Sequence, residues 1–326
     1  PDPARCREMI DHAIAVEQEG LWGQAYLDLT GEEEEVPETW ITRAGDKLRS
    51  VGIPVTLERY STPIPGGYPM RDPVFYFGWR EPEANGPFLD KQFQFQKGAI
   101  AAHVTQDSAS SLRDEDSWAG CLLSRGATVV MGNVSDPFLP LSHQLDLFVD
   151  RLIQGFTVAE SAAIASQSLS WKGVVIGDPL YQPFPKKGEP LKEEKFGKDQ
   201  MAPYKVLRLA YGRWGEGNVL PDRDLLFKLE LASAKLPRAE LIEHLGLTSM
   251  ALGDFREAGT HFLRAKAKYE GARDRLRMDL HRVDLERVQG EVLRARRILQ
   301  EAIQDYAEIP EGNAAEVFLD SLQVKK

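Results

Sequence analysis

The sequence predicts two domains, an α/β domain with a parallel sheet followed by an all-helical repeat domain. Short strand-like runs alternate with helical segments at first, a charged and proline-rich stretch follows, and helical periodicity then continues to the C-terminus. A chain of 326 residues also exceeds the length of about 250 residues at which single cores usually stop growing. We therefore expect an α/β domain over residues 1–185, a linker over 186–200 and a helical domain over 201–326.

The strands of the first domain are predicted by short runs of β-branched and aromatic residues bounded by Gly, Pro or Asp. These runs lie at 53–57, 74–77, 98–104, 127–131 and 173–176. Helices are expected at 2–19, 37–50, 116–125, 144–154 and 158–166. Because the later helices lie between strands, the connections are crossovers and the sheet is predicted to be parallel. The strands are continuously apolar, so both faces of the sheet should be covered.

The helical domain contains a spacing that is typical of tetratricopeptide repeats, in which small residues admit large ones from the paired helix. The first copy consists of Leu245, Gly246, Gly253, Asp254, Phe255, Ala258, Phe262 and Ala265. A second copy follows at Gly290, Val292, Ala295, Leu299 and Ala302. The alternative is a general array of helical hairpins that matches by chance. A repeat domain of this kind predicts a protein or peptide as the binding partner.

Composition excludes several classes of function. The net charge of −10 repels nucleic acid, so no nucleic-acid partner is predicted. The apolar runs are far shorter than the roughly 20 residues that cross a bilayer, so no membrane span is predicted. Cys6 and Cys121 are the only cysteines and form no CxxC pair. A P-loop, a complete GxGxxG and an HExxH motif are all missing, so we predict neither a metal nor a cofactor.

The candidate site residues are those that follow the predicted strands, because open parallel sheets bind ligands beyond the carboxyl ends of their strands. They are Trp79, Arg80, His103, Thr105, Asp107, Ser108, Asn133 and Asp178.

Two interpretations of these residues are open. In the catalytic one, Ser108 is a nucleophile, His103 its base and Asp178 or Asp107 the group that orients the base, which describes a hydrolase of peptide or ester bonds. Asn133 then stabilises an oxyanion. In the structural one, His103 bonds a backbone group, Ser108 caps a helix, and Asp178 and Asn133 start turns.

Several stretches of the first domain resemble an uncharacterised bacterial family that is distantly similar to the caspase-like fold of gingipains, clostripain-type peptidases and CHAT domains. The stretches are 74–79, 98–103, 108–109, 126–127, 132–134, 169–171 and 177–181. The resemblance covers about residues 5–185. Members of that family usually carry a further α/β portion before this point, which implies that this chain is a truncated or shortened relative.

The resemblance implies a fold but no cysteine-protease activity. Caspase-like peptidases carry a histidine after one strand and a cysteine after the next. Trp79 stands at the first position here, and the loop from His103 to Ser108 at the second contains no cysteine. Without the Cys-His pair, no thiolate nucleophile forms. We therefore expect an interaction or scaffold protein. The alternatives are the Ser108–His103 hydrolase and a carbohydrate or small-ligand binder that uses Trp79, Trp118 and Trp171.

Overall fold

The computed structural model divides the chain into two compact units. The α/β unit consists of Pro1–Pro63 and Asp72–Leu191, and the helical unit consists of Ile64–Arg71 and Lys192–Lys326. The residues that the structure describes are 2–31, 35–60, 62–168, 170–184, 199–214 and 222–322. The predicted linker, residues 186–200, lies almost wholly outside them. Among the described residues, no helix has the length and apolar character needed to cross a membrane.

The α/β unit is built on a six-stranded sheet with the order β2-β1-β3-β4-β5-β6. The strands are β1 (Gln24–Asp28), β2 (Val55–Glu58), β3 (Pro73–Trp79), β4 (Ile100–Val104), β5 (Val129–Asn133) and β6 (Gly173–Ile176). The first five are parallel, as predicted. The sequence runs predict five of the six strands. The additional strand, β1, lies between β2 and β3, and all five of its residues are buried.

The last strand differs from the prediction, because β6 is antiparallel to β5. The connection between them explains the difference. It contains two helices, α4 (Leu145–Ile153) and α5 (Val158–Ala165), which pack against each other. One crossover helix returns the chain to the edge where the previous strand began, whereas two successive helices return it to the edge where that strand ended. The next strand therefore runs backwards, and the sheet is only mostly parallel.

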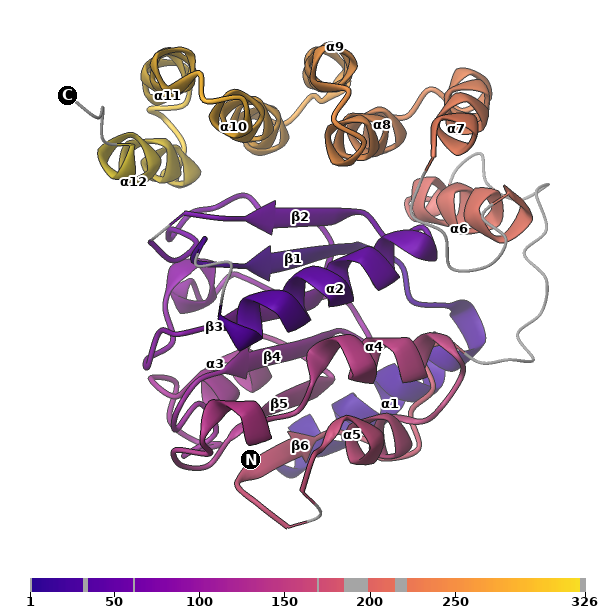
Figure 1. Ribbon diagram of the computed structural model, residues 1–326, viewed down its shortest axis with the longest axis vertical. Helices are drawn as coiled ribbons and strands as arrows, with labels where there is room; N and C mark the ends of the chain where they lie inside the picture. Colours follow the sequence, from indigo (N-terminus) through magenta and orange to yellow (C-terminus); the bar gives the residue numbers. More distant parts are fainter. Residues whose placement is uncertain are drawn as a thin grey trace. The chain divides into compact units, whose positions relative to one another are not determined.

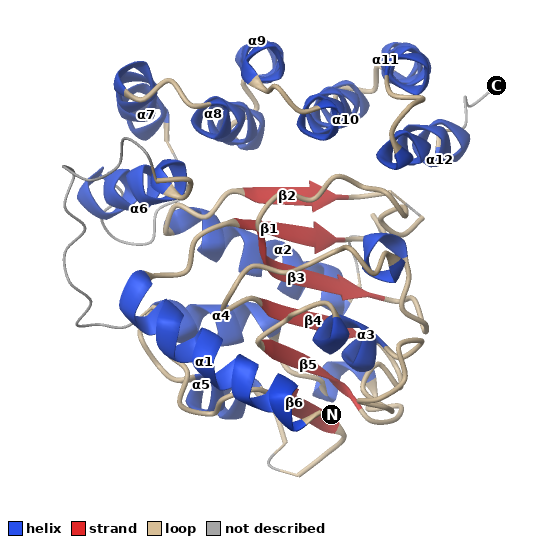
Figure 2. Cartoon of the chain, turned by 180° about the vertical axis from the view of Figure 1, so that it is seen from behind, coloured by secondary structure: helices blue, strands red, loops and turns tan. Residues whose placement is uncertain are grey.

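Helices cover both faces of this sheet, as the apolar strands predict. Figures 1 and 2 show α2 (Val36–Ser50), α4 and α5 on one face, and α1 (Pro3–Glu19) and α3 (Trp118–Ser124) on the other. The first helix begins where the sequence indicates, since the Asp2 carboxylate accepts a hydrogen bond from the Ala4 amide at 3.0 Å. It ends at Gly20, whose φ of +94° favours glycine.

The helical unit is a succession of helices that contact their neighbours in sequence, as in Figure 1. They are α6 (Ala202–Trp214), α7 (Arg223–Lys235), α8 (Ala239–Ala251), α9 (Phe255–Lys268), α10 (Ala272–Val288), α11 (Val292–Asp305), η4 (Pro310–Gly312) and α12 (Asn313–Ser321). Nearest-neighbour packing of this kind stabilises each helix pair through the pairs beside it. The predicted helical C-terminal region is therefore confirmed.

One glycine determines how closely α8 and α9 pack. A Cβ atom at Gly246 would lie 2.5 Å from a ring carbon of Phe262, well inside van der Waals contact. Phe262 is fully buried. Because Gly246 of α8 has no side chain, the Phe262 ring can occupy the space beside it.

We predict that Gly246→Ala lowers the free energy of unfolding by about 1–3 kcal/mol, because the new methyl group displaces the Phe262 ring. Urea unfolding followed by far-UV circular dichroism measures the change. The matched control is Gly212→Ala in α6, where an added Cβ meets no atom of the described residues within 4 Å. That control should be neutral or stabilising by up to about 1 kcal/mol, because alanine is the better helix former. Equal effects at both positions would contradict this packing argument.

Candidate functional site

The carboxyl edge of the α/β sheet is closed at β3 by Trp79. Its side chain belongs to the hydrophobic core, and its indole N–H donates a hydrogen bond to Glu38 Oε1 at 2.8 Å. Glu38 lies on α2 and also accepts hydrogen bonds from the backbone N–H and the hydroxyl of Thr30. The tryptophan therefore packs beneath the strand ends and does not line an open cleft.

His103 lies inside β4 and not in the loop that follows it. The side chain is buried, and its ring stacks on Trp118 with 3.8 Å between the ring centroids and 7° between the planes. Neither ring nitrogen has a hydrogen-bond partner within the part of the chain that the structure describes. Burial lowers the pKa of His103 well below its ordinary value of 6.5. The imidazole is therefore neutral at physiological pH and makes no hydrogen bond to Ser108.

Ser108 is bonded to a different set of groups. Its Oγ donates to the Thr105 carbonyl at 3.3 Å and accepts from the backbone N–H of Asn133 at 3.0 Å. The Asn133 Nδ2 in turn donates to the Thr105 carbonyl at 3.0 Å and to Ser142 Oγ at 3.1 Å. All four residues are buried. Together they fasten the loop after β4 to the end of β5. The Ser108 side chain does not cap α3, which begins after Ser117, but the Ser108 carbonyl accepts a hydrogen bond from the Ala119 amide of that helix at 2.8 Å.

The side chains of the other predicted site residues, Arg80, Asp107 and Asp178, lie outside this hydrogen-bond network of Thr105, Ser108, Asn133 and Ser142. The Thr105 hydroxyl donates to the Arg80 carbonyl at 3.1 Å, which joins the loops after β3 and β4. The side chains of Arg80 and Asp107 are exposed, and both residues have positive φ, +85° and +59°. Asp178 follows the antiparallel β6, so it lies at the opposite edge of the sheet. Its carboxylate accepts from the Leu180 amide at 2.9 Å, which is the turn role.

The free space at this edge is small. One pocket is lined by Ala102, His103, Val104, Met131, Gly132, Asn133, Ser142, His143 and Leu145, and its volume is about 10 Å³. That is room for roughly one water molecule. This pocket does not hold a peptide.

Buried carboxylates between β1 and β2 were missed in the sequence, because β1 was not predicted. Asp28 and Glu58 are neighbours in register, and the Tyr76 hydroxyl donates to Asp28 at 3.2 Å. Burial and the nearby Asp28 raise the pKa of Tyr76 well above its ordinary value. Glu58 accepts from the Tyr60 amide at 2.7 Å. Among the described residues, no group of three or more His, Cys, Asp or Glu residues is arranged to hold a metal.

The helical unit contains a second candidate site, which the sequence did not indicate. The segment Ile64–Arg71 belongs to this unit although it lies between β2 and β3 in the chain. It begins with a turn in which the Tyr68 amide donates to the Pro65 carbonyl at 3.0 Å, and Gly67 has a φ of +85°. A Cβ at Gly67 would lie 3.2 Å from the Cα of Glu311, so glycine permits this close approach to η4.

The middle of the segment is held through its backbone. Arg277 Nη1 donates to the Pro69 carbonyl at 3.4 Å, and Arg273 Nη2 donates to the Met70 carbonyl at 3.1 Å. Both arginines lie on α10. The buried Tyr68 ring makes an edge contact with Phe318 of α12, with 6.1 Å between the centroids and 88° between the planes.

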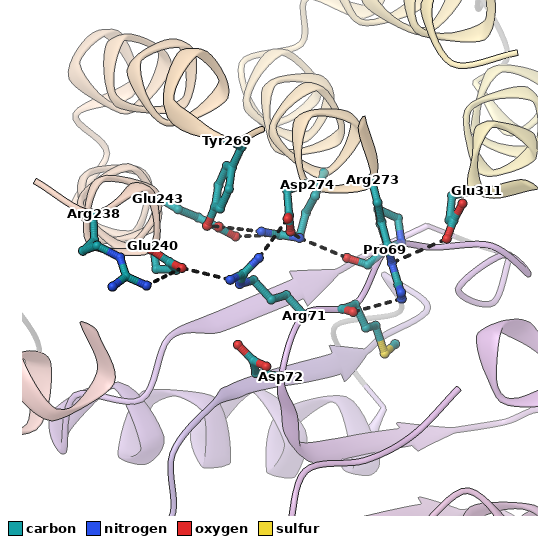
Figure 3. A network of polar contacts seen from close by, with 12 residues as sticks. Pro69, Arg71, Asp72, Arg238, Glu240, Glu243, Tyr269, Arg273, Asp274 and Glu311 are labelled. Carbon is teal, nitrogen blue, oxygen red and sulfur yellow. Dashed lines mark hydrogen bonds and ion pairs between the residues drawn. The ribbon is translucent and has the colours of Figure 1, made fainter. Parts of the chain in front are cut away.

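Arg71 ends the segment between two carboxylates, as Figure 3 shows. Its Nη1 lies 2.8 Å from Asp274 Oδ2 and its Nη2 lies 2.9 Å from Glu240 Oε1. The guanidinium also lies over the ring of Tyr269, 5.4 Å from the centroid. The Arg71 side chain is only 29% exposed, so these interactions are partly shielded from water.

A buried ion pair lies beneath the segment and positions Arg277. The Nε and Nη2 atoms of Arg277 each donate to Glu243 at 2.8 Å. The same carboxylate accepts from the Tyr269 hydroxyl at 2.6 Å and lies 3.2 Å from His281 Nε2. Burial raises the pKa of Glu243, but Arg277 and His281 outweigh it, so the pKa lies well below its ordinary value of 4.5. The third nitrogen of Arg277, Nη1, donates to Asp274 at 2.6 Å and to the Pro69 carbonyl at 3.4 Å.

No protein-family model, curated protein or solved structure matches the chain.

We predict that Ser108→Ala lowers the free energy of unfolding by about 1–3 kcal/mol, because the buried Asn133 amide loses its acceptor. Chemical denaturation measures the loss, and the exposed Ser110→Ala is the control with almost no effect expected. A fluorophosphonate probe should leave Ser108 unmodified in the native chain. Labelling that Ser108→Ala abolishes would contradict this structural role and favour the hydrolase.

A second prediction concerns Glu243. Its folded pKa is lower than its unfolded pKa, so its contribution to stability is complete above about pH 4.5 and declines as the pH falls below that value. Glu243→Gln should lower the unfolding free energy at pH 7 by about 3–5 kcal/mol, since the buried Arg277 then loses the carboxylate that binds two of its nitrogens and keeps only Asp274 as a charged partner.

The test is chemical denaturation of both proteins from pH 7 to pH 3. The difference between native chain and variant should shrink as the pH falls below about 4.5. Glu291→Gln, on an exposed side chain, is the control and should change stability little at either pH. A difference that is independent of pH would show that the charge of Glu243 is not the stabilising feature.

Proposed function

We propose that this chain is a protein-interaction scaffold in which a tetratricopeptide-like helical domain binds a peptide segment of a partner, beside a caspase-like α/β domain without a catalytic pair. One observation carries the proposal. The helical unit holds an eight-residue stretch of chain, Ile64–Arg71, by interactions that proteins use to bind peptides. Backbone carbonyls, one aromatic ring and one arginine of the segment all contact helix side chains.

The repeat assignment is supported by the packing of the helices. Helices α8, α9, α10 and α11 contact one another in sequence order, and the small residue at Gly246 admits Phe262 as the repeat spacing predicts. Stacked repeats of this type present an extended surface that suits an extended or turned peptide.

The caspase-like assignment without catalysis is supported by the strand ends. Trp79 is the last residue of β3, and the Thr105–Ser108 loop follows the adjacent strand β4. A caspase-like peptidase carries its histidine and cysteine at these two strand ends. Trp79 is bonded to Glu38 at 2.8 Å, and the loop contains no thiol. Cys121 cannot substitute, because burial raises the pKa of its thiol to about 11 and little thiolate exists at pH 7.

The two rival functions receive less support. The hydrolase needs a hydrogen bond between Ser108 and His103, whereas Ser108 is bonded to Thr105 and Asn133 and His103 stacks on Trp118. The carbohydrate binder needs exposed tryptophan faces. Trp79 and Trp118 are buried, and Trp171 is half-exposed with its N–H bonded to the Pro137 carbonyl at 2.6 Å.

The proposal predicts the outcome of a selection from a displayed library of random dodecapeptides. The targets are the full chain and the same chain with residues 64–71 replaced by a Gly-Ser linker of equal length, which clears the site. Peptides should be enriched on the cleared chain, and Glu240→Lys combined with Asp274→Lys should abolish the enrichment by reversing the charge of the site.

The control for that charge change is Glu257→Lys combined with Glu301→Lys, two exposed positions on α9 and α11 of the same unit. These substitutions should leave the selection intact. Absence of enrichment on the cleared chain, with its helical circular dichroism retained, would contradict the proposed function.

A further inference from the structure

We propose that the helical unit recognises an arginine preceded at three residues by an aromatic side chain, and that Ile64–Arg71 is its resident ligand, which a partner segment of the same pattern displaces. This inference rests on the proposed function, since it specifies the chemistry of the bound peptide. It depends on three sets of contacts, made by Arg71, by Tyr68 and by the two carbonyls between them.

The arginine position is the most selective of the three. Glu240 and Asp274 lie on different helices, α8 and α10, and each binds a different terminal nitrogen of Arg71. A planar guanidinium reaches both carboxylates and still lies over the ring of Tyr269, whereas an ammonium is a single point of charge. Arginine should therefore be preferred over lysine at this position.

The site is incomplete without that guanidinium. The Glu240 side chain is 7% exposed, and its Oε1 also lies 3.5 Å from Nη2 of Arg238. Asp274 also binds Arg277 at 2.6 Å, but Arg277 already neutralises Glu243. Within the described part of the unit, these three carboxylates, Glu240, Asp274 and Glu243, pair with two arginines, Arg238 and Arg277, when Arg71 is absent. A cationic peptide side chain relieves that imbalance.

The aromatic position and the backbone contacts set the spacing. The Tyr68 ring packs against Phe318 on α12, so the ligand spans from α12 to α8 within four residues. Arg277 and Arg273 bind the carbonyls of the two intervening residues, and such bonds do not depend on side-chain identity. The pattern that the site reads is therefore an aromatic residue, two less restricted residues and an arginine.

The resident segment is joined to the chain at both ends, so its binding is intramolecular. Short connections of this kind give an effective concentration on the order of 1 mM. A free peptide with a Kd near 10 µM would then bind the intact chain about 100-fold more weakly than a chain whose site is clear. The segment thereby sets a minimum affinity that a partner peptide needs in order to displace it.

The test uses a fluorescent peptide that copies residues 62–73, TPIPGGYPMRDP, and fluorescence anisotropy. Its targets are the full native chain and the full chain with residues 64–71 replaced by a Gly-Ser linker. The peptide should bind the replaced chain about 100-fold more tightly than the native chain. The same peptide with Arg71→Lys should bind at least about 10-fold more weakly, and one with Gly66→Ala, at an exposed turn position, should bind equally well.

A second variant covers the case in which the linker chain does not fold. Arg71→Ala in the full chain weakens the resident segment but keeps its length, so the native peptide should bind this variant more tightly than it binds the native chain. Gly66→Ala in the full chain is the control and should behave like the native chain.

The outcomes separate the inference from the proposed function. If the peptide binds neither folded variant, the segment is a permanent part of the unit and the inference is wrong. If library selection on the cleared chain enriches peptides without arginine, the inference is also wrong but the proposed function stands. Binding that is equally strong with Arg71→Lys would overturn the arginine preference.

Discussion

The helical unit depends on one buried ion pair, between Glu243 on α8 and Arg277 on α10. Both side chains are almost completely inaccessible, and removing such charges from water is costly unless every hydrogen-bonding group is satisfied. Tyr269 and His281 supply the other hydrogen-bonding contacts of the Glu243 carboxylate. The remaining nitrogen of Arg277, Nη1, donates to the Pro69 carbonyl. The pair therefore holds two helices at a defined separation and at the same time presents a donor to the segment Ile64–Arg71. The geometry around the segment Ile64–Arg71 follows from this internal arrangement.

In the α/β unit, the polar side chains at the strand ends form hydrogen bonds with one another and not with an added segment of chain. Open parallel sheets usually leave polar side chains available beyond the carboxyl ends of their strands. In this unit those side chains bond one another: Trp79 bonds Glu38, and Ser108 bonds Asn133. These bonds stabilise the loops and occupy the side chains of Trp79, Ser108 and Asn133. This contrast between bonded side chains at the sheet edge and charged side chains on the helical unit supports the proposal that the helical unit binds the partner.

The sequence was informative where a signal is local. Helix α1 was predicted from Asp2, Pro3 and Gly20, and five strands were predicted from their apolar runs and boundaries. Two features of the sheet depend on longer-range geometry and were not predicted. Strand β1 is five residues long and ends in a buried Asp28, so its sequence lacks a clear strand pattern. The direction of β6 is set by the pairing of α4 and α5, so Asp178 was expected at the wrong edge.

The candidate site was predicted less well, for the same reason. Thr105, Ser108 and Asn133 do meet, as the rule for parallel strands indicates, but only the structure shows that they bond one another. His103 belongs to the strand itself, and its burial removes it from that group. The segment Ile64–Arg71 resembles an ordinary Pro- and Gly-rich loop in the sequence. Its partners Glu240 and Asp274 are separated from Arg71 by 169 and 203 residues, so no local pattern could connect them.

The helical unit consists of two separate stretches of chain, so a single cut in the chain does not separate the two units. A fragment that starts near residue 200 omits Ile64–Arg71. It therefore lacks the groups of that segment that contact Arg273, Phe318 and Glu240. Conversely, a fragment that ends before residue 190 retains Tyr68 and Met70 without the helices that bury them. The covalent order of the chain and its division into folded units are therefore different. Exchange of either unit between related proteins would need to transfer both stretches together.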